Sequence, residues 1–403
     1  MKPDRYKWAV VGMLWGISFF NYADRQAVFS VFPLLEKEML LSSVHLGLLG
    51  SSFALVYGIC GIFAGAIVDR VRRVSAILWG LYVWSVICVA TAASRTFQQL
   101  LGFRAAEGLG ETLYFPASMS LISGYHGRET RSRAMGLHQT SVYVGTVAGG
   151  FFAGLIGQRY GWRWSFIVFG GAGILLGSVL HRFLREPPGK PAETPMPLRT
   201  FAVLLRKPTV LCLMAAFLCA NFVAVVLLSW MPKFLYDKFH MTLAMAGLTA
   251  TIFVQLASMI GSPIGGWLAD TLRKKRPGGR LMVQALGVFA GAPFVVLCGL
   301  TDSATWLVVA LTLWGLAKGM YDANIFASMY DVVPPEARGS AAGMMNTVGW
   351  LGGGAVAPLA IGVLAQTYGL GVAIAMASVV YLLAGGFLLT AIALFVKRDT
   401  ETF

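Results

Sequence analysis

Long apolar stretches separated by short polar segments run through the whole sequence. Twelve such stretches can be counted, each close to the roughly 20 residues that an α-helix needs to cross a bilayer. They span residues 8–32, 44–68, 74–93, 97–123, 134–157, 162–184, 209–231, 244–269, 281–300, 304–331, 341–366 and 371–396. The longest interruption, residues 185–208, is rich in proline and charge and leaves six stretches on either side. The pattern predicts an all-α integral membrane protein with twelve transmembrane helices.

The two sets of six stretches repeat each other in sequence. RSRAMGLHQT at residues 131–140 matches RGSAAGMMNT at 338–347, for example. Parallel six-helix repeats on either side of a central cavity are a transporter architecture, with the substrate site near the membrane midplane. The sequence therefore predicts two pseudo-symmetric six-helix bundles, residues 1–184 and 209–403, joined by a linker at 185–208.

Composition supports a membrane protein and excludes several other classes. Hydrophobic residues make up 57% of the 403 residues and charged residues only 12%, against roughly 25% charged residues in soluble domains. The net charge of +14 does not indicate a nucleic-acid partner, because the basic residues lie in short loops between apolar stretches. The sequence has no phosphate-binding G-x-x-x-x-G-K-[ST] motif and no metal-ligand spacing. We expect no cofactor, no metal and no enzymatic activity, and we expect the five cysteines to be buried small hydrophobes.

Lysine and arginine are distributed unevenly between the two sides of the predicted bundle. The termini, the linker with its flanks and the loops after stretches two, four, eight and ten hold 23 of the 32 basic residues. The loops on the opposite side hold six, namely Lys37, Arg95, Arg159, Arg163, Lys233 and Lys238. Cytoplasmic loops carry the excess of positive charge. We therefore expect a multi-pass protein of the inner (cytoplasmic) membrane with both termini in the cytoplasm.

Charged residues interrupt the first and the fourth apolar stretches. Arg104, Glu107 and Glu111 are three and four residues apart, which places them on one face of an α-helix. Asp24 and Arg25 lie well inside the first stretch. A charge at the centre of a membrane helix costs about 2.5–3.5 kcal/mol on insertion scales, so these residues predict a polar interior that compensates them. Desolvation raises the pKa of a carboxyl group and a nearby arginine lowers it, which lets such a group exchange protons near neutral pH.

Two loops and one helix carry a resemblance to a known family. The G-x-x-x-D-R-x-R-R loop at Gly65–Arg73, its second copy at Gly266–Lys274 and the R-x-x-x-G pattern at 104–108 resemble the major facilitator superfamily of secondary transporters. The resemblance covers essentially the whole chain, although Arg72 stands where that family usually has a glycine. Within the superfamily, Asn21–Arg25 is similar to the first helix of both the anion:cation symporters and the spinster-like transporters.

The fourth apolar stretch points to the same two subfamilies. Residues 104–116 resemble the anion:cation symporters of sugar acids and other organic carboxylates, whereas Gly108–Glu111 is equally close to the spinster pattern. The symporter resemblance implies that Asp24 and Glu111 are the proton-binding carboxylates. It also implies that Arg25 binds the carboxylate of the substrate.

Several further polar residues are candidates for the binding site. Arg104 is expected to pair with one of the carboxylates, because an unpaired guanidinium cannot deprotonate. Glu107 is either a third proton site or the structural partner of Arg104. Lys318 either attracts the anion or only neutralises Asp322, four residues further on. The remaining candidates for substrate contact are Tyr22, Tyr57, Gln139 and Asn346.

Charged residues of the repeated loops are candidates for gating. Asp69, Arg70 and Arg73 lie in the first loop, and Asp270 lies in its second copy. We expect them to form charge pairs between helices that hold one conformation and break in the other.

Small residues gather in the fifth apolar stretch. Gly145, Gly149, Gly150 and Gly154 are predicted to form one face for close helix approach between the two halves. His138, near that face, is expected to be a core or cavity-wall residue.

These features together predict a proton-coupled symporter of a small organic anion, such as a sugar acid or hydroxy acid, working by alternating access. Its expected partners are the anionic substrate, protons and the lipid bilayer, and the chain is expected to act as a monomer. A spinster-like transporter of lysolipid or sphingoid substrates is the alternative, and sodium stays open as the coupling ion. A non-transporting receptor or a membrane enzyme is disfavoured, because no soluble domain or nucleophile–base arrangement is present.

Overall fold

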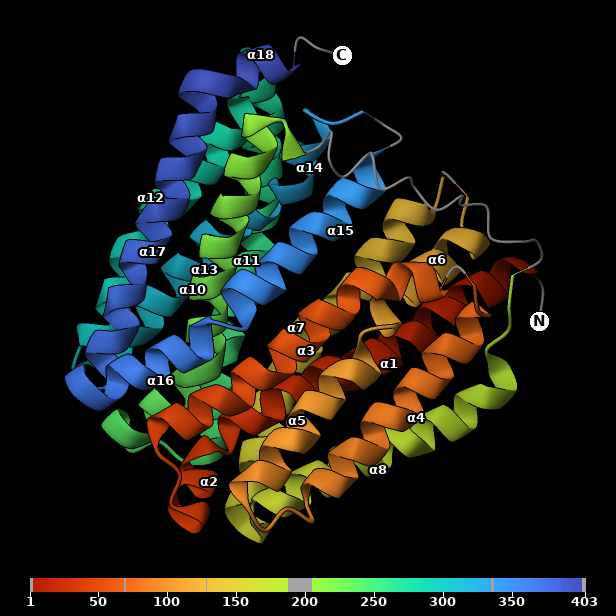
Figure 1. Cartoon of the computed structure of the whole chain (residues 1–403), viewed down its shortest axis with the longest axis vertical. Coiled ribbons are helices and arrows are strands. Elements are labelled where there is room, and N and C mark those ends of the chain that lie inside the picture. The colour runs from red at the N-terminus through yellow and green to blue at the C-terminus, as the bar shows by residue number, and fades with distance from the viewer. Residues whose placement is uncertain (1–2, 69, 128, 188–204, 335–336, 401–403) are drawn as a thin grey trace. The chain divides into compact units, whose positions relative to one another are not determined.

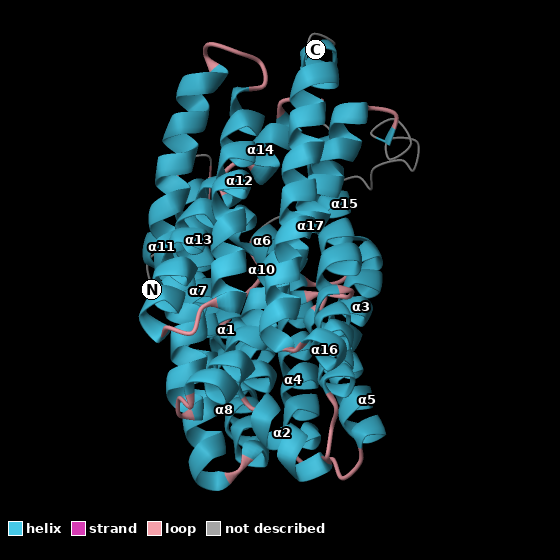
Figure 2. Ribbon diagram, turned by 90° about the vertical axis from the view of Figure 1, so that its left-hand side faces the viewer, coloured by secondary structure: helices cyan, strands magenta, loops and turns pink. Residues whose placement is uncertain are grey.

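The computed structural model describes residues 3–68, 70–127, 129–187, 205–334 and 337–400. Helices are the only regular elements of this described part, as Figure 2 shows. Each of the twelve apolar stretches coincides with a helix or with consecutive helices, so the all-helical prediction is confirmed.

In the described segments the helices follow one another along the chain (Figure 1). The first half contains α1 (Pro3–Ser30), α2 (Phe32–Met39), α3 (Ser43–Val68), α4 (Arg73–Thr91), α5 (Phe97–Glu111), α6 (Tyr114–Tyr125), α7 (Arg131–Tyr160) and α8 (Trp162–Phe183). The second half contains α10 (Pro208–Phe239), α11 (Leu243–Arg273), α12 (Gly279–Leu300), α13 (Ala304–Asp322), α14 (Ile325–Tyr330), α15 (Arg338–Val348), the π-helix η2 (Gly349–Gly354), α16 (Ala357–Tyr368), α17 (Leu370–Thr390), the π-helix η3 (Ala391–Phe395) and α18 (Val396–Thr400).

Ten spans within the described residues are long and apolar enough to cross a membrane. Two expected spans fall outside that set, namely α1 and the pair α5–α6. The helices α5 and α6 have 15 and 12 residues, so each alone is shorter than the roughly 20 residues that a bilayer requires. The segments α1 and α5–α6 are also the ones that carry the charged residues of the first and fourth stretches.

Several predicted spans are broken where the sequence suggested continuous helices, and two of these breaks lie in the fourth and tenth spans. The stretch at 97–123 forms α5 and α6 with a turn after Glu111, and the stretch at 304–331 forms α13 and α14 with a turn after Asp322. The breaks occur at corresponding places in the two halves. Discontinuous helices of this kind line the binding sites of many secondary transporters.

Several helices extend further than their apolar stretches. Lys37 lies on α2, and Lys233 and Lys238 lie on α10, although the sequence suggested that these lysines belong to loops. This prediction was wrong because polar residues at the end of an apolar run can continue the helix beyond the hydrocarbon region.

Packing divides the chain into two compact units. One comprises Met1–Pro195 together with Met231–Thr251, and the other comprises Met196–Trp230 together with Ile252–Phe403. The end of α10 and the start of α11 therefore pack with helices of the first half. The boundaries expected from sequence alone stay a prediction.

Glycines allow α1 and α7 to pack with their backbones in contact. Gly145 lies against the backbone of Phe19, and Gly149 lies against the backbone of Ala23. Because both partners advance together by one turn, the two helices run parallel. This register places the backbone next to Asp24 against α7.

The other two glycines of α7 face a different helix. Gly150 lies against the backbone of Gly247, and Gly154 lies against Leu243 and Ala244, all at the start of α11. The prediction of one small-residue face was therefore wrong, since the four glycines form two faces. Adjacent positions on a helix point about 100° apart, which separates Gly149 from Gly150.

Gly149→Ala is expected to destabilise the protein by about 1–3 kcal/mol, because the added methyl group would overlap the carbonyl oxygen of Ala23. Gly171→Ala on α8 is the matched control, since a Cβ there meets nothing within 4 Å. The control should be as stable as the parent or more stable, because alanine favours a helix over glycine. Thermal unfolding in detergent measures both variants, and equal midpoints would contradict the packing argument.

Candidate functional site

Five charged residues of α1 and α5 form a buried cluster. Arg25 is 8% exposed, and Asp24, Arg104, Glu107 and Glu111 are each 3% exposed or less. The three residues of α5 share a face because they are three and four positions apart. The cluster is the polar interior that the charged residues of the sequence predicted.

One ion pair of the cluster joins α1 to α5. The Nε of Arg25 donates to the Oε2 of Glu111. Aromatic rings surround the guanidinium, whose Cζ lies 4.5 Å from the ring centre of Tyr57 and 4.9 Å from that of Tyr22. A planar cation between aromatic faces is a typical site for a carboxylate, because the guanidinium edge stays available for bidentate hydrogen bonds.

The second ion pair lies within α5. The Nη1 of Arg104 donates to the Oε2 of Glu107, three residues away. The ring of Phe53 lies between the two guanidiniums, with its centre 5.1 Å from the Cζ of Arg25 and 5.0 Å from that of Arg104. The sequence analysis missed Phe53. Its spacing of four residues from Tyr57 on α3 was the available signal.

Asp24 has a neutral partner in the thiol of Cys88. The Sγ of Cys88 donates to the Oδ1 of Asp24 at 3.0 Å, and it also lies 3.3 Å from the carbonyl oxygen of Phe166. Cys88 was expected to be only a small hydrophobe, so this contact corrects that prediction. Its position in an apolar stretch gave no signal of a polar role.

Asp24, Cys88 and Glu107 bring three potential metal-ligand atoms within 4.8 Å of one another. The guanidinium of Arg104 already contacts the Glu107 carboxylate. A divalent cation at this place would lie beside that fixed positive charge. The donor set therefore fits a proton better than it fits a metal.

An unpaired amide lies one turn from Arg25 on α1. Asn21 is 1% exposed, and its Nδ2 has no hydrogen-bond acceptor among the described residues. Asn221, which follows it by 200 residues and matches it in the sequence repeat of the second half, donates to the carbonyl oxygen of Gly349 at 2.7 Å. A buried donor without an acceptor is costly, which makes Asn21 a candidate donor to a bound ligand.

The polar residues of the second half form a smaller group. Lys318 donates to Asp322, the pairing that their spacing allows. Asn346 is partly exposed, and on α7 Gln139 is exposed. Substrate contact by Lys318, Gln139 and Asn346 stays a prediction.

His138 is buried, as expected. Its Nε2 lies 2.9 Å from the hydroxyl of Tyr114, which donates to the carbonyl oxygen of Leu14. The imidazole belongs to the packed wall between α1, α6 and α7.

The proposed gating residues are only partly described. Asp69 lies outside the described residues, Arg70 is exposed and Arg73 begins α4. In the second copy, the Oδ1 of Asp270 accepts from Arg280 of α12 at 2.9 Å. Asp331 also accepts from Arg280 at 2.8 Å and from Arg273 of α11 at 3.1 Å. Charge pairs between helices are thus present in the second copy, and their gating role stays a prediction.

A buried lysine joins α10 to α2. Lys233 is 5% exposed, and its Nζ contacts Glu36 of α2 and lies 2.7 Å from Asp237. Lys233 was expected in a loop, and its contacts with Glu36 and Asp237 were not predicted from the sequence. The spacing of four residues between Lys233 and Asp237 was the available signal.

Comparison with known proteins identifies the family of the chain. The sequence matches the Major Facilitator Superfamily over residues 14–357. It is 26% identical over 364 residues to the hexuronate transporter of Bacillus subtilis, covering 86% of each chain. It is 25% identical over 421 residues to the D-galactonate transporter of Escherichia coli, covering 95% of this chain and 94% of that one.

The fold is also found in a solved structure. A bacterial homologue of the human lysosomal transporter spinster, in an inward-facing and unoccupied conformation, superposes with a TM-score of 0.88 at 22% identity. The match covers 100% of this chain and 98% of that one. The chain therefore belongs to the major facilitator superfamily, a family of multi-pass membrane transporters and not of enzymes.

Proposed function

We propose that this protein is a proton-coupled symporter of a small organic anion, such as a sugar acid or hydroxy acid. The observation that carries the proposal is the charge balance of the buried cluster. It contains three carboxyl groups, of Asp24, Glu107 and Glu111, and two guanidinium groups, of Arg25 and Arg104. With every group ionised, the cluster would hold one uncompensated negative charge.

An uncompensated charge in a buried site costs several kcal/mol, and binding one proton removes it. Glu111 pairs with Arg25, and Glu107 pairs with Arg104. Asp24 has no ion pair with a described arginine, and its partners are the neutral thiol of Cys88 and the carboxyl group of Glu107, with which it can share a proton. Asp24 is therefore the carboxyl group that holds the proton in the absence of substrate.

Substrate binding extends the same charge balance. An arriving carboxylate can replace Glu111 on the guanidinium of Arg25, because both offer the same pair of oxygen atoms. Glu111 then loses its counter-charge and takes up a proton of its own. The loaded site thus carries two protons, one on Asp24 and one on Glu111, and net uptake requires both carboxyl groups to release their protons to the cytoplasm in each cycle.

The chemistry of the site and the names of two relatives support an organic anion as substrate. Arg25 offers a cation for a carboxylate, and Tyr22 and Tyr57 offer flat faces for the carbon skeleton. Two relatives are named for hexuronate and D-galactonate, which are hydroxylated carboxylates.

Alternating access would come from rocking of the six-helix bundles at 1–184 and 209–403. The excess of lysine and arginine on one side favours an inner-membrane protein with both termini in the cytoplasm. Uptake would then follow the proton gradient into the cell.

Proteoliposomes loaded with a pH-sensitive dye test the proposal. D-galactonate, D-glucuronate, neutral sugars and lysolipids are added in turn, with and without a sodium gradient. Internal acidification on adding a sugar acid is the expected result. A response to lysolipids alone would favour the spinster-like alternative, and uptake that needs sodium without any pH change would replace the proton as coupling ion.

Arg25→Ala is expected to raise the half-saturation concentration of substrate exchange for anionic substrates about 10–100-fold. The reason is that a hydrogen bond to a charged group contributes about 1.5–3 kcal/mol. A neutral analogue, such as the corresponding sugar alcohol, should be affected much less. Arg25→Ala/Glu111→Gln is the matched control, since it removes the carboxylate that the single variant leaves unpaired. Equal losses for charged and neutral compounds in both variants would assign Arg25 a structural role.

A further inference from the structure

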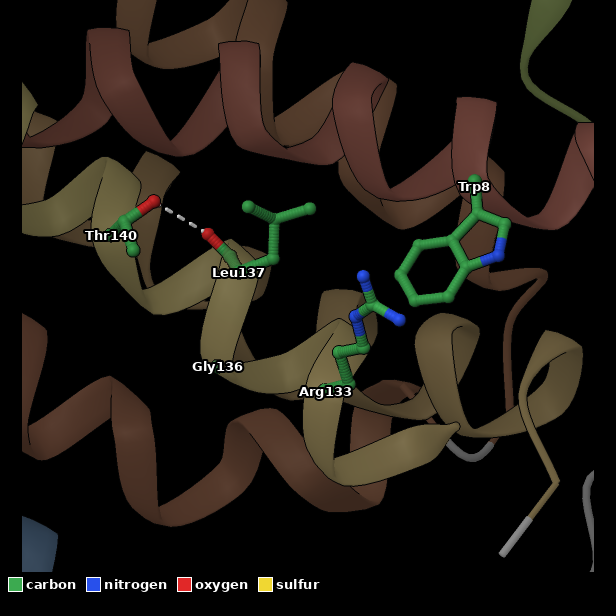
Figure 3. Close-up of a pocket in the computed structure, with 5 residues that line it drawn as sticks. All are labelled: Trp8, Arg133, Gly136, Leu137 and Thr140. Atoms are coloured by element: carbon green, nitrogen blue, oxygen red, sulfur yellow. Dashed lines mark hydrogen bonds between the residues drawn. The ribbon is translucent and has the colours of Figure 1, made fainter. Parts of the chain in front are cut away.

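A hollow of about 590 Å³ lies along α1 and α7 near the N-terminal ends of both helices. Trp8, Arg133, Gly136, Leu137 and Thr140 line it (Figure 3). We propose that this hollow is a second binding site for a hydroxylated carboxylate, occupied as the substrate passes to or from Arg25. We call it the outer site because it lies nearer the N-terminal ends of these helices than Arg25 does. The inference rests on the proposed function, because the same substrate class would use both sites.

Arg133 supplies the cation of the outer site. Its Cζ lies 5.5 Å from the ring centre of Trp8, and Figure 3 shows the guanidinium directly beside the indole ring. Arg133 is exposed and makes no ion pair with a described residue. A guanidinium held over an aromatic ring keeps its edge available for a bidentate carboxylate. The arrangement repeats the pairing of Arg25 with Tyr22.

Polar and apolar contacts for the rest of the ligand lie beside Arg133. The Oγ1 of Thr140 accepts from the Nε1 of Trp15 at 2.9 Å and donates to the carbonyl oxygen of Leu137 at 2.7 Å. One lone pair of that hydroxyl is left to accept from a substrate hydroxyl. Gly136 leaves the hollow open, because a Cβ there would meet nothing within 4 Å.

An aromatic stripe of α1 connects the hollow to the buried cluster. Trp8, Trp15, Phe19 and Tyr22 recur at helical spacing and fall within a sector of about 60°. The rings of Trp15 and Phe19 stack with centres 5.6 Å apart, and Tyr22 contacts the guanidinium of Arg25. A carboxylate bound at the hollow would thus lie at one end of a row of aromatic side chains that leads along α1 to Arg25.

The internal repeat shows that the fold does not require the charge. Arg133 aligns with Ser340 when RSRAMGLHQT is matched to RGSAAGMMNT. Gly136 aligns with Gly343, so the open position is present in both copies. The cation is therefore an addition specific to the first half.

Equilibrium binding of radiolabelled D-galactonate and D-glucuronate to the purified full chain in nanodiscs of neutral lipid tests this inference. Arg25→Ala removes the main cation of the central site, and we expect weaker binding to remain in that variant. Adding Arg133→Ala should weaken the remaining binding at least about tenfold, and Arg133→Lys should weaken it less. Arg159→Ala, an exposed arginine near the other end of α7, is the control and should change nothing.

The possible failures can be told apart. Absence of Arg133-dependent binding for both sugar acids would overturn the outer site, whatever the transport assay shows. The measurement is repeated in nanodiscs that contain phosphatidylglycerol. Arg133-dependent retention of that lipid without sugar-acid binding would make the hollow a lipid-headgroup site and would overturn the outer site as well. Loss of the proposed function would look different, because the wild-type protein would bind sugar acids at Arg133 without acidifying the proteoliposomes.

Discussion

Asp24→Asn is expected to abolish proton-driven accumulation of the substrate while substrate exchange stays measurable. Asp24 is the carboxyl group whose protonation makes the buried cluster neutral, and its neighbour is a thiol. Asparagine resembles the protonated acid in shape and hydrogen bonding but cannot release a proton. The bundles can therefore still move with bound substrate, whereas the proton gradient no longer drives net uptake.

Two assays on the same proteoliposomes separate these effects. Uptake driven by a pH gradient should fall to the level without a gradient, and counterflow of preloaded substrate should continue. Glu111→Gln should behave in the same way, because Glu111 is the group that takes up a proton when substrate replaces it on Arg25.

Substitutions of Cys88 control for damage to the site. Cys88→Ser keeps a donor next to Asp24 and should retain accumulation, whereas Cys88→Val removes that donor. Accumulation by Asp24→Asn at the wild-type level would remove Asp24 from the coupling mechanism. Loss of exchange together with accumulation would assign Asp24 a structural role.

Hydropathy and residue spacing predicted most of the architecture. Apolar length sets the number of spans, since each helix must satisfy its own backbone hydrogen bonds in lipid. The spacing of Arg104, Glu107 and Glu111 predicted their common face, because helical geometry relates spacing to direction. Membership of the major facilitator superfamily also followed from short loop motifs, and the comparisons confirm it.

Contacts between distant segments could not be predicted in this way. Phe53 lies between two arginines, and Cys88 reaches Asp24, only because α3 and α4 pack beside α1 and α5. Neither residue interrupts its apolar stretch, so neither stands out in the sequence. The two glycine faces of α7 depend on which helix lies against each side of α7. The ion pair of Lys233 with Glu36 depends on the packing of α10 against α2.

Glu107 had two alternative roles, and the geometry favours that of structural partner to Arg104. Removing one member of a buried ion pair typically costs about 3–5 kcal/mol, because the other charge is left uncompensated. Arg104→Leu is therefore expected to destabilise the protein by about that amount. The loss should shrink as the pH is lowered, since a protonated carboxyl group needs no counter-charge. Thermal unfolding in detergent at several pH values measures both effects.

The double variant Arg104→Leu/Glu107→Leu is expected to recover most of the lost stability, because apolar residues can replace a buried ion pair at little cost. Arg163→Leu is the exposed control: its partner Glu38 is accessible, so the loss should be about 1 kcal/mol or less. Transport by the double variant then decides the role of Glu107. If Glu107 is only the partner of Arg104, a stable double variant keeps proton-driven accumulation through Asp24 and Glu111. A stable double variant with altered proton coupling would make Glu107 a third proton site.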